Sequence, residues 1–303
     1  MTSQTRLDAV STGPTPTGSP DAELSAPQSS AETTQQEHTM PETPKMEISG
    51  VYKSYAVQGK ELMVLKNINL KLAPGEFVCL VGASGCGKST LLNITAGLVN
   101  PSAGQVLVDG NPVKGPGSDR GVVFQNYTLY PWLTVADNIA FGLKLRGVSR
   151  AERRERVAYF LDVVGLTSFS QAMPNQLSGG MKQRVAIARA LANDPEVLLM
   201  DEPFGALDAQ TKEQMQLFFL ELWEKTHTTV LMITHDVEEA IYLAQRVYVM
   251  NSHPGTIRME VPVHFSGNRD LDIKLTPEFI NIKSDIIHAL RADASERAGD
   301  RKS

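Results

Sequence analysis

The sequence is poor in cysteine and has no long apolar run. Only Cys79 and Cys86 occur among its 303 residues, and Cys86 lies in a glycine-rich loop where a cross-link would distort the backbone. This usage is typical of a chain kept in a reducing compartment. No stretch approaches the roughly 18 apolar residues that span a bilayer, and the first residues lack the order of a secretory signal. We therefore expect any membrane association to come through a partner.

Basic charge is also scarce. The chain has 29 basic and 34 acidic residues, and residues 1–44, with one base and six acids, account for the whole net charge of −5. The rest is neutral, and no run of lysine and arginine stands out as a track for a phosphate backbone. The composition therefore predicts no nucleic-acid partner.

The composition changes near residue 45. Residues 1–44 are rich in Ser, Thr, Pro, Gln and Glu and nearly lack large apolar residues, which predicts a disordered acidic tail. Apolar runs with strand character follow, at Met46–Tyr55, Val64–Leu72, Glu76–Val81, Gln105–Val108, Gly121–Phe124, Val197–Met200 and Thr229–Ile233. Because helical patterns lie between them, we expect an α/β fold with a mostly parallel core sheet. Few strand signals occur over about 126–195, which predicts a helical insertion.

Three helices have clear sequence signals. Ser149 and Glu152 form a capping box that opens the first, and residues 209–226 form the second. Residues 276–291 form the third, with Thr276 as cap and Pro277 at the first helical position. We expect residues 261–303 to form an extension made of this amphipathic helix and a polar tail.

A glycine-rich segment follows the apolar strand 77–81 and precedes a helical run from Thr90. This strand, loop and helix order is that of a phosphate-binding loop. Glycines let backbone N–H groups converge on phosphate oxygens, while Lys88 reaches the β and γ phosphates and Ser89 binds Mg²⁺. The predicted ATP-binding residues here are Gly82, Ala83, Ser84, Gly85, Cys86, Gly87, Lys88, Ser89 and Thr90.

Two adjacent carboxylates end the apolar strand at 197–200. Acidic residues at strand ends are often turn formers. With a phosphate loop in the same chain, however, Asp201 suits a place near Mg²⁺ and Glu202 a place near the attacking water.

The segment Leu177-Ser-Gly-Gly-Met181 opens a helical stretch and would by itself be an ordinary serine cap. It resembles the signature sequence of ABC ATPases, in which it contacts the γ phosphate held by the opposite subunit. The order of elements in that family is matched by Tyr55, the loop 82–89, Gln125, the signature 177–181, Asp201-Glu202, Asp208 and His235. The resemblance covers about residues 46–260 and looks closest to the nitrate, sulfonate and taurine uptake group. Met181 departs from the usual Gln.

The resemblance implies a P-loop NTPase fold with an antiparallel β subdomain and a helical subdomain, within an ATPase domain at 45–260. It implies an ATP-hydrolysing subunit of an importer for a small anionic or organic solute, peripheral on the cytoplasmic face of the membrane. The expected partners are transmembrane permease subunits, a second ATPase subunit and an extracytoplasmic solute-binding protein. A soluble ABC ATPase acting on DNA or ribosomes is the alternative.

The resemblance also assigns roles to residues. It implies catalytic roles for Lys88, Gln125, Glu202 and His235, Mg²⁺ binding by Ser89, Gln125 and Asp201, and ATP contacts by Tyr55, Ser178, Gly179, Gly180 and Asp208. Taken singly, His235 could be a structural histidine and Tyr55 a packing residue. Trp132, in the segment after Gln125, fits equally a core residue and one lining a cleft that receives a permease helix.

Overall fold

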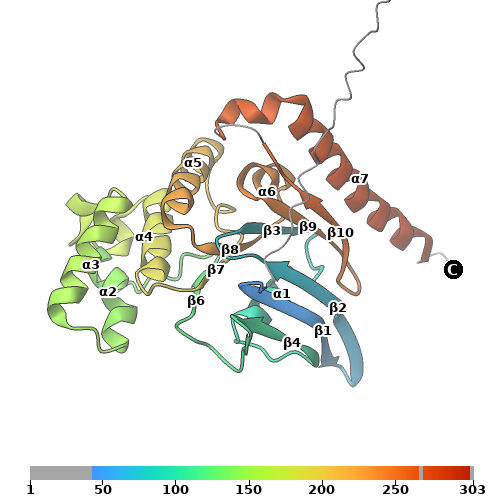
Figure 1. Cartoon of the computed structure of the whole chain (residues 1–303), viewed down its shortest axis with the longest axis horizontal. Helices are drawn as coiled ribbons and strands as arrows, with labels where there is room; N and C mark the ends of the chain where they lie inside the picture. The colour runs from blue at the N-terminus through green and yellow to red at the C-terminus, as the bar shows by residue number, and fades with distance from the viewer. Residues whose placement is uncertain (1–42, 266–268, 301–303) are drawn as a thin grey trace, which may run out of the picture. The chain divides into compact units, whose positions relative to one another are not determined.

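The computed structural model describes residues 43–265 and 269–300 (Figure 1). The predicted tail lies outside the described residues apart from its last two positions. None of the helices in the described part is long and apolar enough to cross a membrane.

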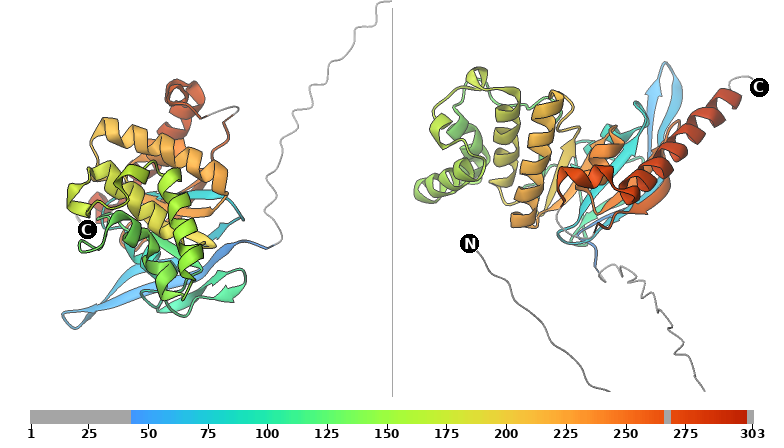
Figure 2. Two further views of the ribbon diagram at one scale, coloured as in Figure 1. Left: turned by 90° about the vertical axis from the view of Figure 1, so that its left-hand side faces the viewer. Right: turned by 90° about the horizontal axis from the view of Figure 1, so that it is seen from above.

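An antiparallel sheet comes first in the chain. Its strand order is β2-β1-β4-β5, and each neighbouring pair is antiparallel. The strands are β1 (Met46–Val57), β2 (Lys60–Leu72), β4 (Ala103–Val108) and β5 (Asn111–Pro112). Figure 2 shows the long β1–β2 hairpin extending from the rest of this sheet.

The second sheet has six strands in the order β10-β9-β3-β8-β7-β6. The pairs from β9 to β6 are parallel, and only β10 runs antiparallel to its neighbour β9. The strands are β3 (Phe77–Gly82), β6 (Arg120–Val123), β7 (Val197–Asp201), β8 (Thr229–Thr234), β9 (Arg246–Asn251) and β10 (Thr256–Pro262). The carboxyl ends of β3, β7 and β8 therefore meet at one edge, which is where ligands bind in open parallel sheets.

Alternation along the central strand β3 divides the core into two clusters. Phe77, Cys79 and Val81 face the cluster built with the larger set of helices. Val78 and Leu80 face the antiparallel sheet and α1 (Lys88–Thr95). Every residue of β3 is buried, as expected for a central strand with both faces covered.

The helices of the first cluster are α2 (Val135–Leu145), α3 (Arg150–Val163), α4 (Gly179–Leu191), α5 (Ala209–Thr226), α6 (Val237–Leu243) and α7 (Pro277–Asp300). Short 3-10 helices occur at Thr167–Phe169, Pro174–Gln176 and Leu271–Leu275. Figure 1 shows α2, α3 and α4 gathered at one end of the parallel sheet, with α7 beyond β9 and β10 at the other. The predicted fold class, with a mostly parallel core sheet, an antiparallel sheet and a group of helices, is confirmed.

Several local predictions are confirmed as well. The Ser149 side chain accepts a hydrogen bond from the Glu152 N–H and caps α3. Helix α5 has the predicted bounds. The Thr276 hydroxyl accepts from the N–H of Phe279 at the start of α7.

Three elements, β9, β10 and α7, differ from the prediction. The strands β9 and β10 were not predicted, although Val247, Tyr248 and Val249 form a run with high strand propensity. Helix α7 continues to Asp300, whereas the sequence predicted an end at residue 291 and a polar tail. Residues 292–300 include alanine, glutamate and arginine, which favour a helix without any apolar stripe.

Candidate active site

The phosphate loop joins β3 to α1 and depends on close backbone packing. Gly87 has φ +104, and a Cβ there would lie 2.6 Å from Leu65 Cδ2. A Cβ on Gly82 would lie 2.8 Å from Cys86 Sγ and 2.9 Å from the Met250 carbonyl oxygen. Residues 83–85, at the crest of the loop, are exposed. The glycines thus shape a loop whose backbone faces solvent at its crest, which fits the approach of a phosphate group.

Lys88 is held at the base of this loop. Its side chain is buried, and its Nζ donates to the carbonyl oxygens of Gly82 at 2.8 Å and Ala83 at 3.2 Å. The ammonium group therefore lies beside the loop that a phosphate would enter. Thr90, two residues further along α1, is partly exposed.

The Ser89 hydroxyl meets the end of β7. Ser89 Oγ lies 3.4 Å from Asp201 Oδ1, although the two residues are 112 positions apart. Burial raises the pKa of Asp201, and the nearby Glu202 acts in the same direction, against the hydrogen bond from Ser89 and the charge of Lys88. A bound cation would offset this cost of burying a carboxylate, and hydroxyl and carboxylate oxygens are the ligands that Mg²⁺ prefers. These residues fit Mg²⁺ in a site completed by phosphate oxygens. The described residues contain no cluster of three or more His, Cys, Asp or Glu that could hold a metal alone.

Glu202 lies at the meeting point of three elements. Its Oε2 is 3.1 Å from His235 Nδ1, after β8, and 3.4 Å from Gln125 Nε2, after β6. Glu202 has φ +42, a left-handed conformation, and its N–H donates to the Ile233 carbonyl oxygen at 2.9 Å. Non-glycine residues in this conformation carry strain and are concentrated at functional sites. The structure thus brings together Gln125, Glu202 and His235.

The signature segment makes a different set of contacts. Ser178 caps α4 by accepting from the Met181 N–H at 3.3 Å. Gly180 packs so closely against α5 that a Cβ would lie 2.9 Å from Thr211 Cγ2, and Gly179 faces Tyr127 and Leu207. Figure 1 places α4 beside α2 and α3, whereas α1 lies near the antiparallel sheet. The predicted contact of this segment with a γ phosphate stays a prediction.

Asp208 caps α5. Its carboxylate accepts from the Thr211 N–H at 3.0 Å, and hydrogen bonds from the side chain and backbone of Thr211 lower the pKa of Asp208. The structure shows Asp208 as a helix cap, and its predicted contact with nucleotide stays a prediction.

The two aromatic residues that the sequence singled out are both exposed. Tyr55, at the end of β1, is 39% exposed, and Lys53 Nζ lies 4.9 Å from its ring centroid. An exposed ring on β1 is available for stacking on a base, which stays a prediction for Tyr55. Trp132 is 70% exposed and makes an aromatic contact with Tyr130 at 5.7 Å between centroids. It is therefore a surface residue, and the alternative of a core residue is wrong.

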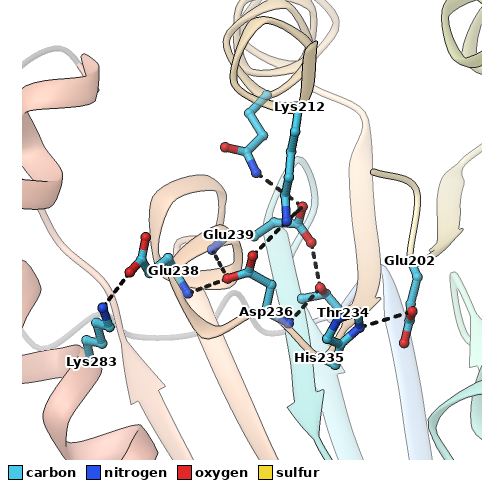
Figure 3. A network of polar contacts seen from close by, with 9 residues as sticks. Glu202, Lys212, Thr234, His235, Asp236, Glu238, Glu239 and Lys283 are labelled. Carbon is cyan, nitrogen blue, oxygen red and sulfur yellow. Dashed lines mark hydrogen bonds and ion pairs between the residues drawn. The ribbon is translucent and has the colours of Figure 1, made fainter. Parts of the chain in front are cut away.

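The turn that carries His235 is held by residues that sequence reasoning did not single out. Thr234, Asp236 and Glu239 are linked by hydrogen bonds, and Lys212 of α5 reaches Asp236 at 2.6 Å (Figure 3). The sequence held one signal for this network, the glutamate that lies four positions after His235 at the start of an apolar run in α6. A charged residue at a buried position is rarely without a partner, so Glu239 indicated a polar contact near His235.

Comparison with known proteins places this geometry in a family. The family described as ABC transporter matches residues 65–205. The nitrate import ATP-binding protein NrtD of Synechocystis sp. is 53% identical over 83% of this chain and 97% of its own length. The taurine import ATP-binding protein TauB of Pseudomonas syringae is 44% identical over 85% of this chain and 98% of its own length.

Solved structures agree with these relatives. The ATP-binding cassette MJ0796, seen as a dimer in a post-hydrolysis state bound to ADP and Pi, is 36% identical and aligns over 73% of this chain and 99% of its own, with a TM-score of 0.63. The cbiO1 protein of Clostridium perfringens, part of the ABC transporter complex cbiONQ, is 26% identical over 79% of this chain and 94% of its own, with a TM-score of 0.67.

The predicted resemblance to the nitrate and taurine import proteins is confirmed, and these relatives do not support a role on DNA or ribosomes. The chain belongs to the ABC transporter family, as an ATP-binding protein that hydrolyses ATP.

Proposed function

We propose that this chain is the ATPase subunit of an importer for a small anionic or organic solute of the nitrate, sulfonate or taurine type. The names of the relatives at 44 to 53% identity support this solute class. The observation that carries the catalytic part is the convergence of His235 Nδ1 and Gln125 Nε2 on Glu202 Oε2, beside the contact of Ser89 with Asp201.

In the proposed reaction, the Glu202 carboxylate accepts a hydrogen bond from the attacking water and aligns it with the γ phosphorus. The water oxygen forms a bond to the γ phosphorus while the bond from the γ phosphorus to the β–γ bridging oxygen breaks, and the bridging oxygen leaves with ADP. The proton lost by the water passes to the Glu202 carboxylate and from there to the released phosphate. Lys88 and His235 donate hydrogen bonds to the phosphoryl oxygens, on which negative charge lies in the transition state. The protein thus contributes mainly by positioning and by electrostatic stabilisation.

Ser89, Gln125 and Asp201 would hold Mg²⁺ in this site. When bound, the ion neutralises charge on the β and γ oxygens. Burial of Asp201 supports this assignment, because it disfavours an uncompensated carboxylate.

The assembly we propose contains two ATPase subunits, two permease subunits and an extracytoplasmic solute-binding protein, with this chain peripheral on the cytoplasmic face of the membrane. Residues 45–260 would form the ATPase domain, with residues 126–195 as its helical subdomain and 261–303 as an extension. The dimeric structure of the related cassette MJ0796 supports an assembly with two ATPase subunits.

The substitution Glu202→Gln tests the catalytic assignment, since it removes the charge and keeps the shape. We expect ATP binding to stay within about twofold and steady-state hydrolysis to fall by at least about 100-fold. Glu221→Gln, an exposed glutamate of α5, is the matched control and should behave as the unchanged protein. Full turnover by Glu202→Gln would overturn the assignment.

The solute class is tested with the complete importer in proteoliposomes. Nitrate, taurine and an aliphatic sulfonate are offered in turn to the cognate solute-binding protein, and ATP-dependent uptake is measured. Uptake of one of these, abolished by Glu202→Gln, is expected. Absence of uptake for all three, with ATP hydrolysis intact, would refute the solute class and leave the ATPase assignment standing.

A further inference from the structure

A buried carboxylate lies directly behind the turn that carries His235. Glu239, on α6, is 2% exposed. Its Oε2 accepts a hydrogen bond of 2.5 Å from the Thr234 hydroxyl, and its Oε1 accepts one of 3.1 Å from Gln216 Nε2. Lys212 Nζ lies 3.4 Å from the same Oε1. A buried carboxylate is costly unless it is paired and hydrogen-bonded, and both oxygens of Glu239 meet this condition.

These contacts fix the residues on both sides of His235. The Thr234 hydroxyl donates to Glu239 and accepts from the Asp236 N–H at 3.0 Å. Asp236 Oδ1 accepts from the N–H groups of Glu238 and Glu239 at the start of α6. The backbone around His235 is thus held at its preceding and following residue, while the imidazole, 58% exposed, reaches Glu202 (Figure 3).

The same carboxylates connect this turn to α5. Lys212 donates to Asp236 Oδ2 at 2.6 Å, and Lys212 and Gln216 both reach Glu239. Lys212 lies one turn after Asp208, the cap of α5. The His235 turn and α5 therefore share one set of polar contacts, and closely coupled networks of this kind restrict motion more than isolated pairs.

The neighbouring glutamate provides a contrast within the same helix. Glu238 points away from this network and pairs with Lys283 of α7 (Figure 3). Its side chain is 47% exposed. The two adjacent residues have the same chemistry, but of their two side chains it is that of Glu239 that contacts Thr234, Lys212 and Gln216.

We propose that Glu239 is a positioning residue for ATP hydrolysis. Through Thr234 and Asp236 it holds His235 at Glu202, and through Lys212 and Gln216 it ties that turn to α5. This inference rests on the proposed roles of Glu202 and His235.

The first measurement is steady-state ATP hydrolysis by the full chain. Glu239→Gln keeps the shape of the side chain but removes the charge that pairs with Lys212, so the His235 turn loses its fixed position. Because small displacements of catalytic groups have large effects, we expect kcat to fall by about 10- to 100-fold, with KM for ATP within about twofold. The matched control Glu238→Gln should change neither constant.

The second measurement separates positioning from general stability. In protein labelled with ¹⁵N-histidine, the ring signals of His235 are assigned by their absence in His235→Ala. Glu239→Gln should shift these signals and Glu238→Gln should not. Unchanged His235 signals in Glu239→Gln, even with a lower kcat, would overturn the proposal, since the effect would then not pass through His235.

The outcomes keep this inference distinct from the proposed function. Full turnover by His235→Ala would refute the catalytic role of His235. If His235→Ala loses ATP hydrolysis while Glu239→Gln keeps full turnover, the positioning role alone would be refuted. If Glu239→Gln does not fold, Lys212→Met replaces it, because the Lys212 side chain is partly exposed and its loss leaves the same carboxylates without their cation. An unchanged kcat in a folded Lys212→Met protein would then overturn the proposal.

Discussion

The substitution Gly87→Ala tests how closely the phosphate loop is packed. Gly87 has φ +104, which a residue with a Cβ rarely adopts. The added Cβ would lie 2.6 Å from Leu65 Cδ2 and 3.3 Å from Val64 Cγ1. Leu65 is fully buried, so its side chain has little room to move. The substitution therefore combines backbone strain with overpacking.

The two contributions can be estimated separately. A left-handed conformation costs an alanine about 1–2 kcal/mol, and overpacking adds about 1–3 kcal/mol. Gly85→Ala, in the same loop, provides the control: Gly85 has φ +79, but a Cβ there would meet nothing within 4 Å. The free energies of unfolding of the two variants should therefore differ by about 1–3 kcal/mol. In a domain of this size, that corresponds to about 2–12 °C in Tm.

Chemical denaturation of the unchanged protein, Gly87→Ala and Gly85→Ala measures this difference in the free energy of unfolding. Its source is identified by comparing the double variant Leu65→Ala with Gly87→Ala against the two single variants. Because the smaller side chain removes the clash, the double variant should be more stable than the sum of the single effects predicts, by about 0.5–3 kcal/mol. Equal destabilisation by Gly87→Ala and Gly85→Ala, with additive effects in the double variant, would refute the overpacking argument.

Three further results are expected. Phe219→Ala removes a buried ring that contacts Phe77 edge to face, with 5.6 Å between the ring centroids. Chemical denaturation should therefore show a free energy of unfolding lower by about 3–5 kcal/mol, and a decrease below about 1 kcal/mol would contradict this packing. Trp132→Ala removes an exposed ring, so the Tm and the ATPase rate of the isolated chain should stay unchanged while co-purification with the permease falls, and intact co-purification would argue against a docking role. Burial raises the pKa of the Cys79 thiol well above its ordinary value, so a thiol reagent at pH 8 should modify Cys79 only after unfolding; rapid labelling of the native protein, located by mass spectrometry, would contradict this.

The strongest sequence signals were those with a local cause. The phosphate loop follows from glycines between a strand and a helix, and the bounds of α5 follow from its cap at Asp208 and its helical pattern. Capping by Ser149 was likewise predictable, because the partner lies three residues away. The adjacent carboxylates Asp201 and Glu202 were recognisable as candidates only because the phosphate loop was present.

Other features had weaker local signals. Strands β9 and β10 have weak signals because β9 has only six residues and β10 contains Glu260 and Pro262, which are uncommon in strands. The extension of α7 to Asp300 has helix-forming residues but no apolar periodicity, so an amphipathic pattern could not reveal it. Whether Trp132 is buried or exposed depends on what packs beside it, and no spacing rule decides that.

The sequence by itself determined the chemistry of this protein, since residue types at short spacing define the phosphate loop, the carboxylates after β7 and the signature segment. Only the tertiary structure decided which distant residues meet. Ser89 and Asp201 are 112 positions apart, and Lys212 and Asp236 are 24 apart. Parallel strand order brings the first pair together at one sheet edge, and the packing of α5 against α6 brings together the second. Such contacts depend on how whole elements pack, which no local pattern of residues specifies.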